Sequence, residues 1–253
     1  MPYRTNLIYY YDGTYSGFLC CVFECFRAKE MPLGIRREEE EQQTLYGAKE
    51  ILTQPELARR VDRSISEKIS PQAHRLVRAG FLTCLEDREM LLLRFLLMGY
   101  RHGAQVTRWV TREPVHTLNH AVRALRNEAH HTLEFLRFSQ CQGFLAAQIA
   151  PKNAVLPLVV PHFCDRLPSE NFMIFDRVHG MGFVYKETGE RKFFQADQVE
   201  LPPPSEREKE WRALWKAFYK TIAVEGRENH KLRQNLMPKR YWPWMTEFQG
   251  EES

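Results

Sequence analysis

The chain has 253 residues, of which 43% are hydrophobic and 27% are charged, and its formal net charge is +4 at pH 7. This composition is ordinary for a globular protein, and the length suits one large domain or two small ones. The positive surplus is too small to indicate a polyanionic partner by itself.

The six cysteines lie at positions 20, 21, 25, 84, 141 and 164 and form no Cys-x-x-Cys pair. Adjacent Cys20 and Cys21 suit no common disulfide framework. The N-terminus lacks a basic segment followed by an apolar one, and no uninterrupted apolar run reaches the roughly 18 residues of a membrane span. We therefore expect a cytoplasmic protein with reduced thiols and no membrane partner.

The first elements are a strand and a helix. Residues 7–11 form an aromatic run that ends at Asp12-Gly13, which predicts a strand followed by a turn. From Ser16 onward, apolar residues recur at helical spacing, and this helix should end near Met31-Pro32. Residues 36–43 form a charged connector.

Helices dominate the next hundred residues. Helices are predicted over 56–65, from Pro71, over 86–102 and over 114–135. The third of these contains the run MLLLRFLLM, with a single charge, and is expected to be the central buried helix.

The character of the chain changes at Phe138. Residues 142–149 predict a strand, 155–162 a short helix, and 172–176, 182–186 and 191–194 three aromatic strands. Thr188-Gly189 should join the last two strands as a hairpin. After Pro202-Pro-Pro204, residues 205–208 form a capping box. The helix that follows repeats Trp211, Leu214, Trp215, Phe218 and Ile222 at helical spacing.

We thus predict an α+β fold, mostly helical, with a small antiparallel sheet. The sheet comes from the strand–helix–three-strand block within about 142–195, and the N-terminal strand is a candidate to join it. The parts are an N-terminal strand and helical region (1–136), the α+β block (137–200) and a Trp-rich helical region (205–253), and we expect them to interlock as one domain.

The loop Asp12-Gly-Thr-Tyr-Ser-Gly17 has the position of a phosphate loop, which makes Thr14 and Ser16 anion-binding candidates. It lacks the glycine and lysine patterns of known nucleotide loops. The favoured interpretation is that Gly13 and Gly17 permit a tight turn and close helix packing.

Two spacings suggest metals, but we expect none, and no cofactor. Cys21-x-x-x-Cys25 lacks a third cysteine at residue 28, and its cysteines lie on an apolar stripe, so core packing is favoured. Glu128-x-x-His131 has the spacing of di-iron bundles, but we find no glutamates on two further helices to complete such a site.

Basic residues beside aromatic rings and amides suggest contacts with nucleic acid. The structural alternative is that the basic residues form a solvated helix end and that Trp242-Pro-Trp244 packs against the core and covers it. The candidate residues for binding nucleic acid are Arg123, Arg126, Arg137, Arg166, Asn229, Arg233, Asn235, Lys239, Arg240, Tyr241 and Trp242.

A third group surrounds the segment His162-Phe-Cys-Asp-Arg166. His162 and Asp165 are candidates for an oriented general-base pair, with Asp176 and His130 as further catalytic candidates. A structural ion pair of Asp165 and Arg166, with Arg166 bridging to Asp176, is the favoured alternative.

Several segments, in order along the chain, resemble a bacterial domain-of-unknown-function family described as a probable DNA metabolism protein. The matching segments are 11–19, 128–130 through 137–138, 161–166, 174–176 and the closing Asn229…Asn235…Met237-Pro-Lys-Arg-Tyr-Trp242…Thr246-Glu-Phe248. The resemblance implies companionship with a putative DNA-modification or repair radical SAM protein. Some members of that family carry a C-terminal uracil-DNA-glycosylase-like domain, which is not found in these 253 residues, so we expect no glycosylase activity.

Three hypotheses follow. The first is a DNA-binding accessory protein in repair or modification that acts with a radical SAM partner, with single-stranded DNA among the candidate ligands. The second is an enzyme acting on a nucleic-acid component through His162, Asp165 and Asp176. The third is a non-catalytic assembly subunit. Whether the protein is an enzyme stays open at this point.

Overall fold

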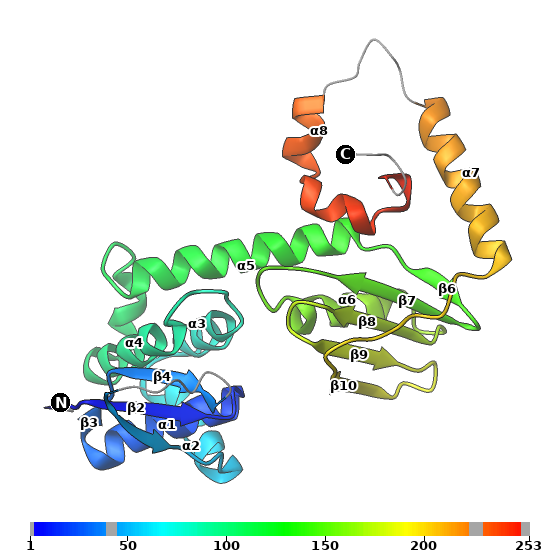
Figure 1. Cartoon of the computed structure of the whole chain (residues 1–253). Helices are drawn as coiled ribbons and strands as arrows, with labels where there is room; N and C mark the ends of the chain where they lie inside the picture. Colours follow the sequence, from blue (N-terminus) through cyan, green and yellow to red (C-terminus); the bar gives the residue numbers. More distant parts are fainter. Residues whose placement is uncertain (1–2, 39–44, 223–229, 249–253) are drawn as a thin grey trace. The chain divides into compact units, whose positions relative to one another are not determined.

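The computed structural model of the chain describes residues 3–38, 45–222 and 230–248. The chain divides into two compact units, residues 1–125 and 126–253, and the boundary falls within helix α5 (Val115–Phe135). Most helices and strands of both units are labelled in Figure 1.

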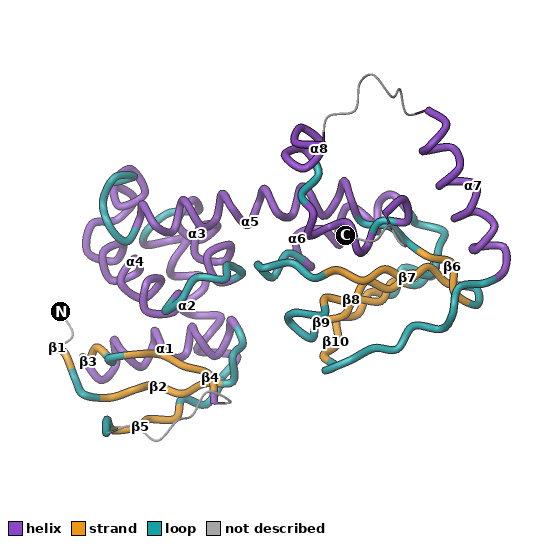
Figure 2. The backbone as a smooth tube through the Cα atoms, turned by 45° about the horizontal axis from the view of Figure 1, so that its top comes forward, coloured by secondary structure: helices purple, strands orange, loops and turns teal. Residues whose placement is uncertain are grey.

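The first unit contains two small parallel sheets. Strand β2 (Leu7–Tyr11) lies between β4 (Gly34–Arg37) and β5 (Gly47–Glu50), and both neighbours run parallel to it. Strands β1 (Tyr3–Arg4) and β3 (Glu30–Met31) form the second parallel pair. Figure 2 shows the strands in orange. The N-terminal strand is thus the centre of its own sheet, so the expectation that it joins the later strands is wrong.

Helices pack around this sheet. They are α1 (Tyr15–Ala28), α2 (Pro55–Lys68), α3 (Pro71–Phe81), α4 (Arg88–His102) and the 3-10 helix η2 (Gly103–Arg108). Pro55 and Pro71 begin α2 and α3, as predicted, because proline has no N–H for the first turn to satisfy.

Helix α4 is buried around most of its circumference. Leu92, Leu93, Phe95 and Leu96 have no exposed surface, and Arg94 is exposed. Cys20, Cys21 and Cys25 of α1 belong to the same core. The predicted central helix and the predicted core packing of Cys21 and Cys25 are therefore confirmed, and Cys20 is a further core residue.

The second unit contains a five-stranded sheet in the order β10-β9-β8-β7-β6. Its elements are β6 (Ser139–Cys141), β7 (Phe144–Ile149), α6 (Leu156–Arg166), β8 (Phe172–Asp176), β9 (Met181–Tyr185) and β10 (Arg191–Gln195).

This sheet is mixed, which corrects the antiparallel prediction. Strands β7 and β8 run parallel, whereas the other neighbours are antiparallel. Helix α6 connects β7 to β8, and a helical crossover returns the chain to the starting end of the sheet, so the second strand runs in the same direction. The predicted hairpin of β9 and β10 is present.

The end of the chain is helical. Helix α7 (Glu206–Ile222) begins after Ser205, whose Oγ accepts the Glu208 N–H at 3.1 Å, as the capping box predicted. Helix α8 (His230–Leu236) and the 3-10 helices η4 (Lys239–Trp244) and η5 (Thr246–Phe248) follow. Among the described residues, no helix combines the length and the apolar character that crossing a bilayer requires.

Candidate functional site

The turn between β2 and α1 is closed by its own side chains. Asp12 Oδ1 accepts bonds from the N–H and the hydroxyl of Thr14 at 2.9 and 2.7 Å, and Asp12 Oδ2 accepts from the Thr53 hydroxyl at 2.7 Å. Thr14 in turn caps α1 by accepting the Gly17 N–H at 2.9 Å. Burial opposes the effect, but these donors hold the pKa of Asp12 below its usual value.

This carboxylate bears on the predicted anion candidates. The donors of Thr14 are already bonded to Asp12, and Ser16 is exposed beside them. A negative charge at the N-terminus of α1 is favourable for the helix and repels a second anion. Anion binding by Thr14 and Ser16 stays a prediction that this geometry does not support.

The interpretation of Gly13 and Gly17 as fold elements agrees with the geometry. Gly13 has a φ of +75°. A Cβ on Gly17 would lie 2.2 Å from Asp12 Oδ1 and 2.7 Å from Thr53 Oγ1. Only glycine therefore lets α1 begin this close to the end of β2.

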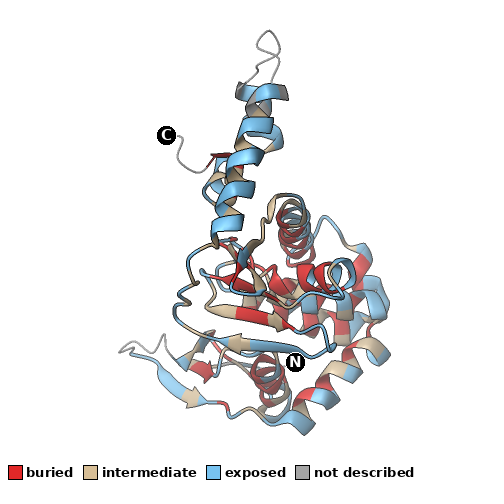
Figure 3. Ribbon diagram, turned by 90° about the vertical axis from the view of Figure 1, so that its right-hand side faces the viewer, coloured by how far each residue is buried: buried red, intermediate tan, exposed pale blue. Residues whose placement is uncertain are grey.

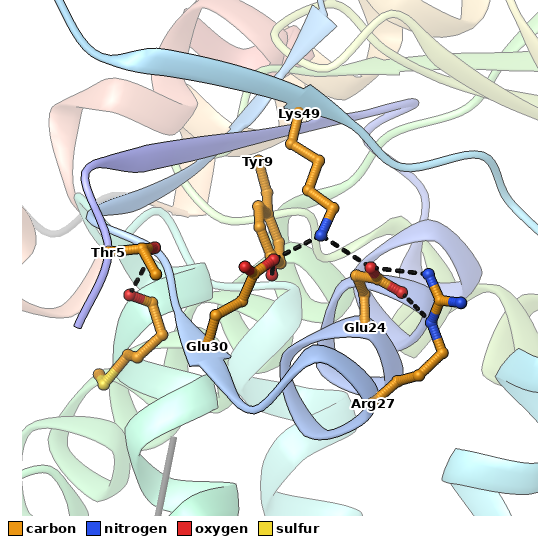
Figure 4. Close-up of polar contacts among 7 residues, drawn as sticks. Thr5, Tyr9, Glu24, Arg27, Glu30 and Lys49 are labelled. Carbon is orange, nitrogen blue, oxygen red and sulfur yellow. Dashed lines mark hydrogen bonds and ion pairs between the residues drawn. The ribbon is translucent and has the colours of Figure 1, made fainter. Parts of the chain in front are cut away.

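A network of charged side chains joins β5, α1 and β3 (Figure 4). The ammonium of Lys49 lies 2.8 Å from Glu24 Oε1 and also bonds to Glu30, which accepts the Tyr9 hydroxyl at 2.6 Å. Arg27 donates two bonds to Glu24 at 2.7 and 2.9 Å. Bonds from Arg27, then from Lys49, lower the pKa of Glu24 to about 2. Every charge in this network has a partner, so we infer that the network stabilises the first unit.

In the second unit, Glu128 is a buried carboxylate with four donors. Its side chain accepts the N–H groups of Lys152 and Asn153, each at 2.9 Å, and the Asn153 amide at 2.6 Å. The guanidinium of Arg240 lies 2.9 Å from Glu128 Oε1. These donors fill the sites on Glu128 at which a metal ion would be coordinated.

A second buried carboxylate, Glu247, organises the C-terminal segment. Its Oε1 accepts from Arg137 at 3.1 Å, and its Oε2 accepts the Trp215 indole N–H at 3.2 Å. Arg137 also donates to the carbonyl of Glu134 at 3.0 Å. The charge of Arg137, like that of Arg240, is therefore balanced by a buried glutamate.

The other predicted nucleic-acid contacts lie in different surroundings. The exposed ones are Arg123 in the first unit, and Arg126, Arg166, Asn235 and Lys239 in the second. Asn229 and the side chain of Arg233 lie outside the described residues.

The predicted stacking rings are half-buried. The Tyr241 ring packs against His131 and Phe135, with centroid distances of 6.0 and 5.3 Å. The Trp242 ring stacks on Phe248 at 4.6 Å, with Lys239 on the ring at 5.7 Å. Tyr241 also lines a narrow cleft of the second unit together with Phe135, Gln148 and Trp244. Both rings thus take part in packing the C-terminal segment.

Among the described residues, no hydrogen bond or ion pair connects the predicted catalytic residues to one another. His162 and Asp165 are both exposed on α6. His130 Nε2 lies 3.2 Å from Glu134. Asp176 is 1% exposed and pairs with a residue that the sequence analysis did not consider, since its Oδ2 lies 2.7 Å from His179 Nδ1.

The Asp176–His179 pair has a defined geometry. Asp176 Oδ1 accepts the N–H groups of Val178 and His179 at 3.0 and 3.2 Å, which fixes the carboxylate in the turn between β8 and β9. A carboxylate on Nδ1 orients the imidazole and leaves Nε2 for another partner. The signal in the sequence is Asp-x-x-His directly after a strand.

Helix α7 consists mostly of exposed residues (Figure 3), and several of them are large and apolar. Trp211, Leu214, Trp215 and Phe218 are between 42 and 61% exposed. We call these four residues the α7 stripe. The neighbouring side of α7 is tied to the rest of the second unit, because Arg212 bonds to Ser139 and the Tyr219 ring meets Phe248 at 5.8 Å.

Comparison with known proteins gives one match. No curated protein and no solved structure matches the chain. Residues 86–247 match the model of DUF4130, a domain of unknown function. Because this match covers more than half of the 253 residues, the chain belongs to the DUF4130 family.

Proposed function

We propose that this protein is an accessory subunit in DNA repair or modification that binds a radical SAM protein through the α7 stripe and also binds DNA. The pathway and the partner come from the family resemblance described above. The observation that carries the proposal is the exposure of Trp211, Leu214, Trp215 and Phe218 along one side of α7.

The spacing of the α7 stripe supports a protein partner. The four residues fall at i, i+3, i+4 and i+7, the pattern by which an amphipathic helix enters an apolar groove. Tryptophan is enriched among residues that contribute most to binding energy. Leaving such side chains in water costs about 25 cal/mol for each Å² of apolar surface, and a partner would remove that cost.

Contacts with the rest of the second unit hold α7 and its stripe in a fixed position. Trp215 contributes its ring to the stripe, while its indole N–H is held by buried Glu247. Glu208 accepts bonds from the Gln140 N–H and from Arg212, which fixes the first turns of α7 to β6. The exposed rings are thus held in place before a partner arrives, which reduces the entropy that binding must lose.

The test is binding to a radical SAM protein from the same organism, measured by isothermal titration calorimetry. Trp211→Ala combined with Phe218→Ala should weaken the complex at least tenfold, because two central anchors are truncated. Val110→Ala, which shortens an equally exposed apolar side chain in the first unit, is the control and should bind normally. Absence of a complex with the unmodified chain would overturn the proposal. Equal affinity of the double variant would reject α7 as its docking surface.

The DNA-binding part of the proposal rests on exposed cations. Among the described residues, Arg126, Arg166 and Lys239 form no ion pair, in contrast to Arg137 and Arg240. Cations without a carboxylate partner are available to phosphates, and such binding weakens with rising salt as counterions are released. A DNA affinity that did not change with salt would count against this role. If the radical SAM protein binds but DNA does not, the protein is an assembly subunit only.

The Asp176–His179 pair favours an enzyme acting on a nucleic-acid component as the second candidate. A histidine oriented by a buried carboxylate is the arrangement of a general base. Incubating the protein with its radical SAM partner, oligonucleotides and nucleotides, followed by mass spectrometry, should then give a product that His179→Gln abolishes. A product that forms equally with His179→Gln would reject His179 as the base, and the absence of any product would reject this candidate.

A further inference from the structure

The edge strand β10 carries a cation, an aromatic ring and an amide on one side. Side chains alternate along a strand, so Arg191, Phe193 and Gln195 point to the same face of the sheet. All three are exposed, and Phe193 is 47% exposed. We call these three residues the β10 row.

The β10 row borders an open groove with a volume of about 270 Å³. Its walls are mostly apolar and are formed by Pro157 from the first turn of α6, Met181, Phe193, Phe194 and Gln195. This volume is slightly below the roughly 300–1,000 Å³ of sites for drug-sized ligands, which suits a single planar ring system.

The Phe193 ring is supported on one side and open on another. Its centroid lies 4.8 Å from that of buried Phe183 on β9. This contact fixes the ring, and its remaining surface faces the groove and solvent. A fixed aromatic ring with an open surface is the platform on which unpaired bases stack.

The charges around the groove favour a polyanion. Arg191 and Lys192 are exposed, and among the described residues neither forms an ion pair with a carboxylate. The guanidinium of Arg191 lies 5.8 Å from the centre of the Tyr185 ring, so it remains near the sheet. Glu190, the acidic neighbour of Arg191, is paired with Lys186 at 2.6 Å. Lys192 points to the opposite face of this edge strand from Phe193, as does Phe194, which also lines the groove. A cation is therefore available to phosphates on each face of the strand.

We propose that the β10 row binds an unpaired base of single-stranded nucleic acid in this groove. Phe193 stacks on the base, the Gln195 amide bonds to the base edge, and Arg191 and Lys192 contact the adjacent phosphates. The inference rests on the DNA-binding part of the proposed function and names the surface and the form of DNA. Charged residues on an edge strand discourage pairing with a further strand, which disfavours a peptide as the occupant.

The test measures fluorescence anisotropy of a labelled single-stranded oligothymidylate at two salt concentrations. Phe193→Ala should weaken binding about tenfold, within the range found when one stacking ring is removed. Phe193→Leu keeps an apolar side chain against Phe183 but lacks the ring. This variant should therefore keep its fold and still lose affinity for the oligonucleotide. Circular dichroism checks that the fold is retained. Val178→Ala, an exposed aliphatic truncation in the β8–β9 turn, should leave binding unchanged.

Two further measurements test the phosphate contacts and the need for an unpaired base separately. Arg191→Ala with Lys192→Ala should reduce the slope of log affinity against log salt by about 2. A duplex of the same length should bind more weakly, because its bases are paired. Equal affinity for duplex DNA, or unchanged affinity of both Phe193 variants, would overturn the inference while the DNA-binding proposal stands. No binding of either DNA by the unmodified chain would overturn both.

Discussion

Arg240 lies 2.9 Å from the carboxylate of Glu128, which is 3% exposed. Arg240 was a candidate for contact with phosphates, and Glu128 began a possible metal motif. Their ion pair gives each residue a structural role. It ties η4 to α5 within the second unit. Arg240 therefore belongs to the cations that stabilise the fold and not to those available to a ligand.

The pair predicts a loss of stability for Arg240→Ala. Removing the guanidinium leaves a buried carboxylate with only its three amide donors, and because Arg240 is partly exposed we expect a loss of about 1–2 kcal/mol. Urea denaturation followed by circular dichroism measures this change. Arg126→Ala, which removes an exposed arginine from the same helix as Glu128, is the control and should leave stability unchanged. Equal stabilities of the two variants would contradict the structural role of Arg240.

Gly17→Ala should destabilise the first unit. The new methyl group would lie 2.2 Å from Asp12 Oδ1, so the bonds that Asp12 accepts from Thr14 and Thr53 must be disturbed. We expect a loss of about 1–3 kcal/mol, as is usual for overpacking. Gly34→Ala is the matched control, because its methyl group meets only Arg36 Nε, at 3.9 Å. A Gly17→Ala melting temperature equal to that of Gly34→Ala would show that the turn relaxes without cost.

Acid should weaken the fold partly through Glu24. Bonds from Arg27 and Lys49 lower the pKa of Glu24 from 4.5 to about 2 in the folded chain. A group whose pKa is lowered by folding adds stability above its unfolded pKa and loses it as pH falls through its folded pKa. The contribution is therefore lost between about pH 4.5 and pH 2. Glu24→Gln should be less stable at neutral pH and should show a smaller further loss across this window.

Exposed Glu50→Gln is the control for that measurement and should follow the unmodified chain. Denaturant unfolding at a series of pH values gives the comparison. A Glu24→Gln curve parallel to that of the unmodified chain at every pH would contradict the role of Glu24.

The cysteines should differ strongly in reactivity. Cys84 is exposed, whereas the other five are buried, and burial raises the pKa of Cys25 to about 12. Because the thiolate is the reactive form, iodoacetamide at pH 8 should modify Cys84 first in the folded protein, and Cys84→Ser should remove the fast phase. Mass spectrometry after short exposure counts the modified residues. Rapid modification of Cys21 or Cys25 would contradict the packing of α1.

Patterns within short segments were sufficient to predict most local structure. The aromatic run at 7–11, the proline starts of α2 and α3, and the Ser205 cap depend on residues a few positions apart, and all appear as expected. The direction of β8 relative to β7 was predicted wrongly, because it depends on the helical connection rather than on the strand residues.

The sequence by itself determined which segments are helices and strands, where several begin, and that Cys21 and Cys25 are core residues. Only the tertiary structure decided which charges are neutralised. Arg137, for example, meets Glu247, which lies 110 residues later in the chain. The physical reason is distance along the chain: periodicity and capping act over a few residues, whereas an ion pair such as Arg240 with Glu128 joins side chains that only folding brings together.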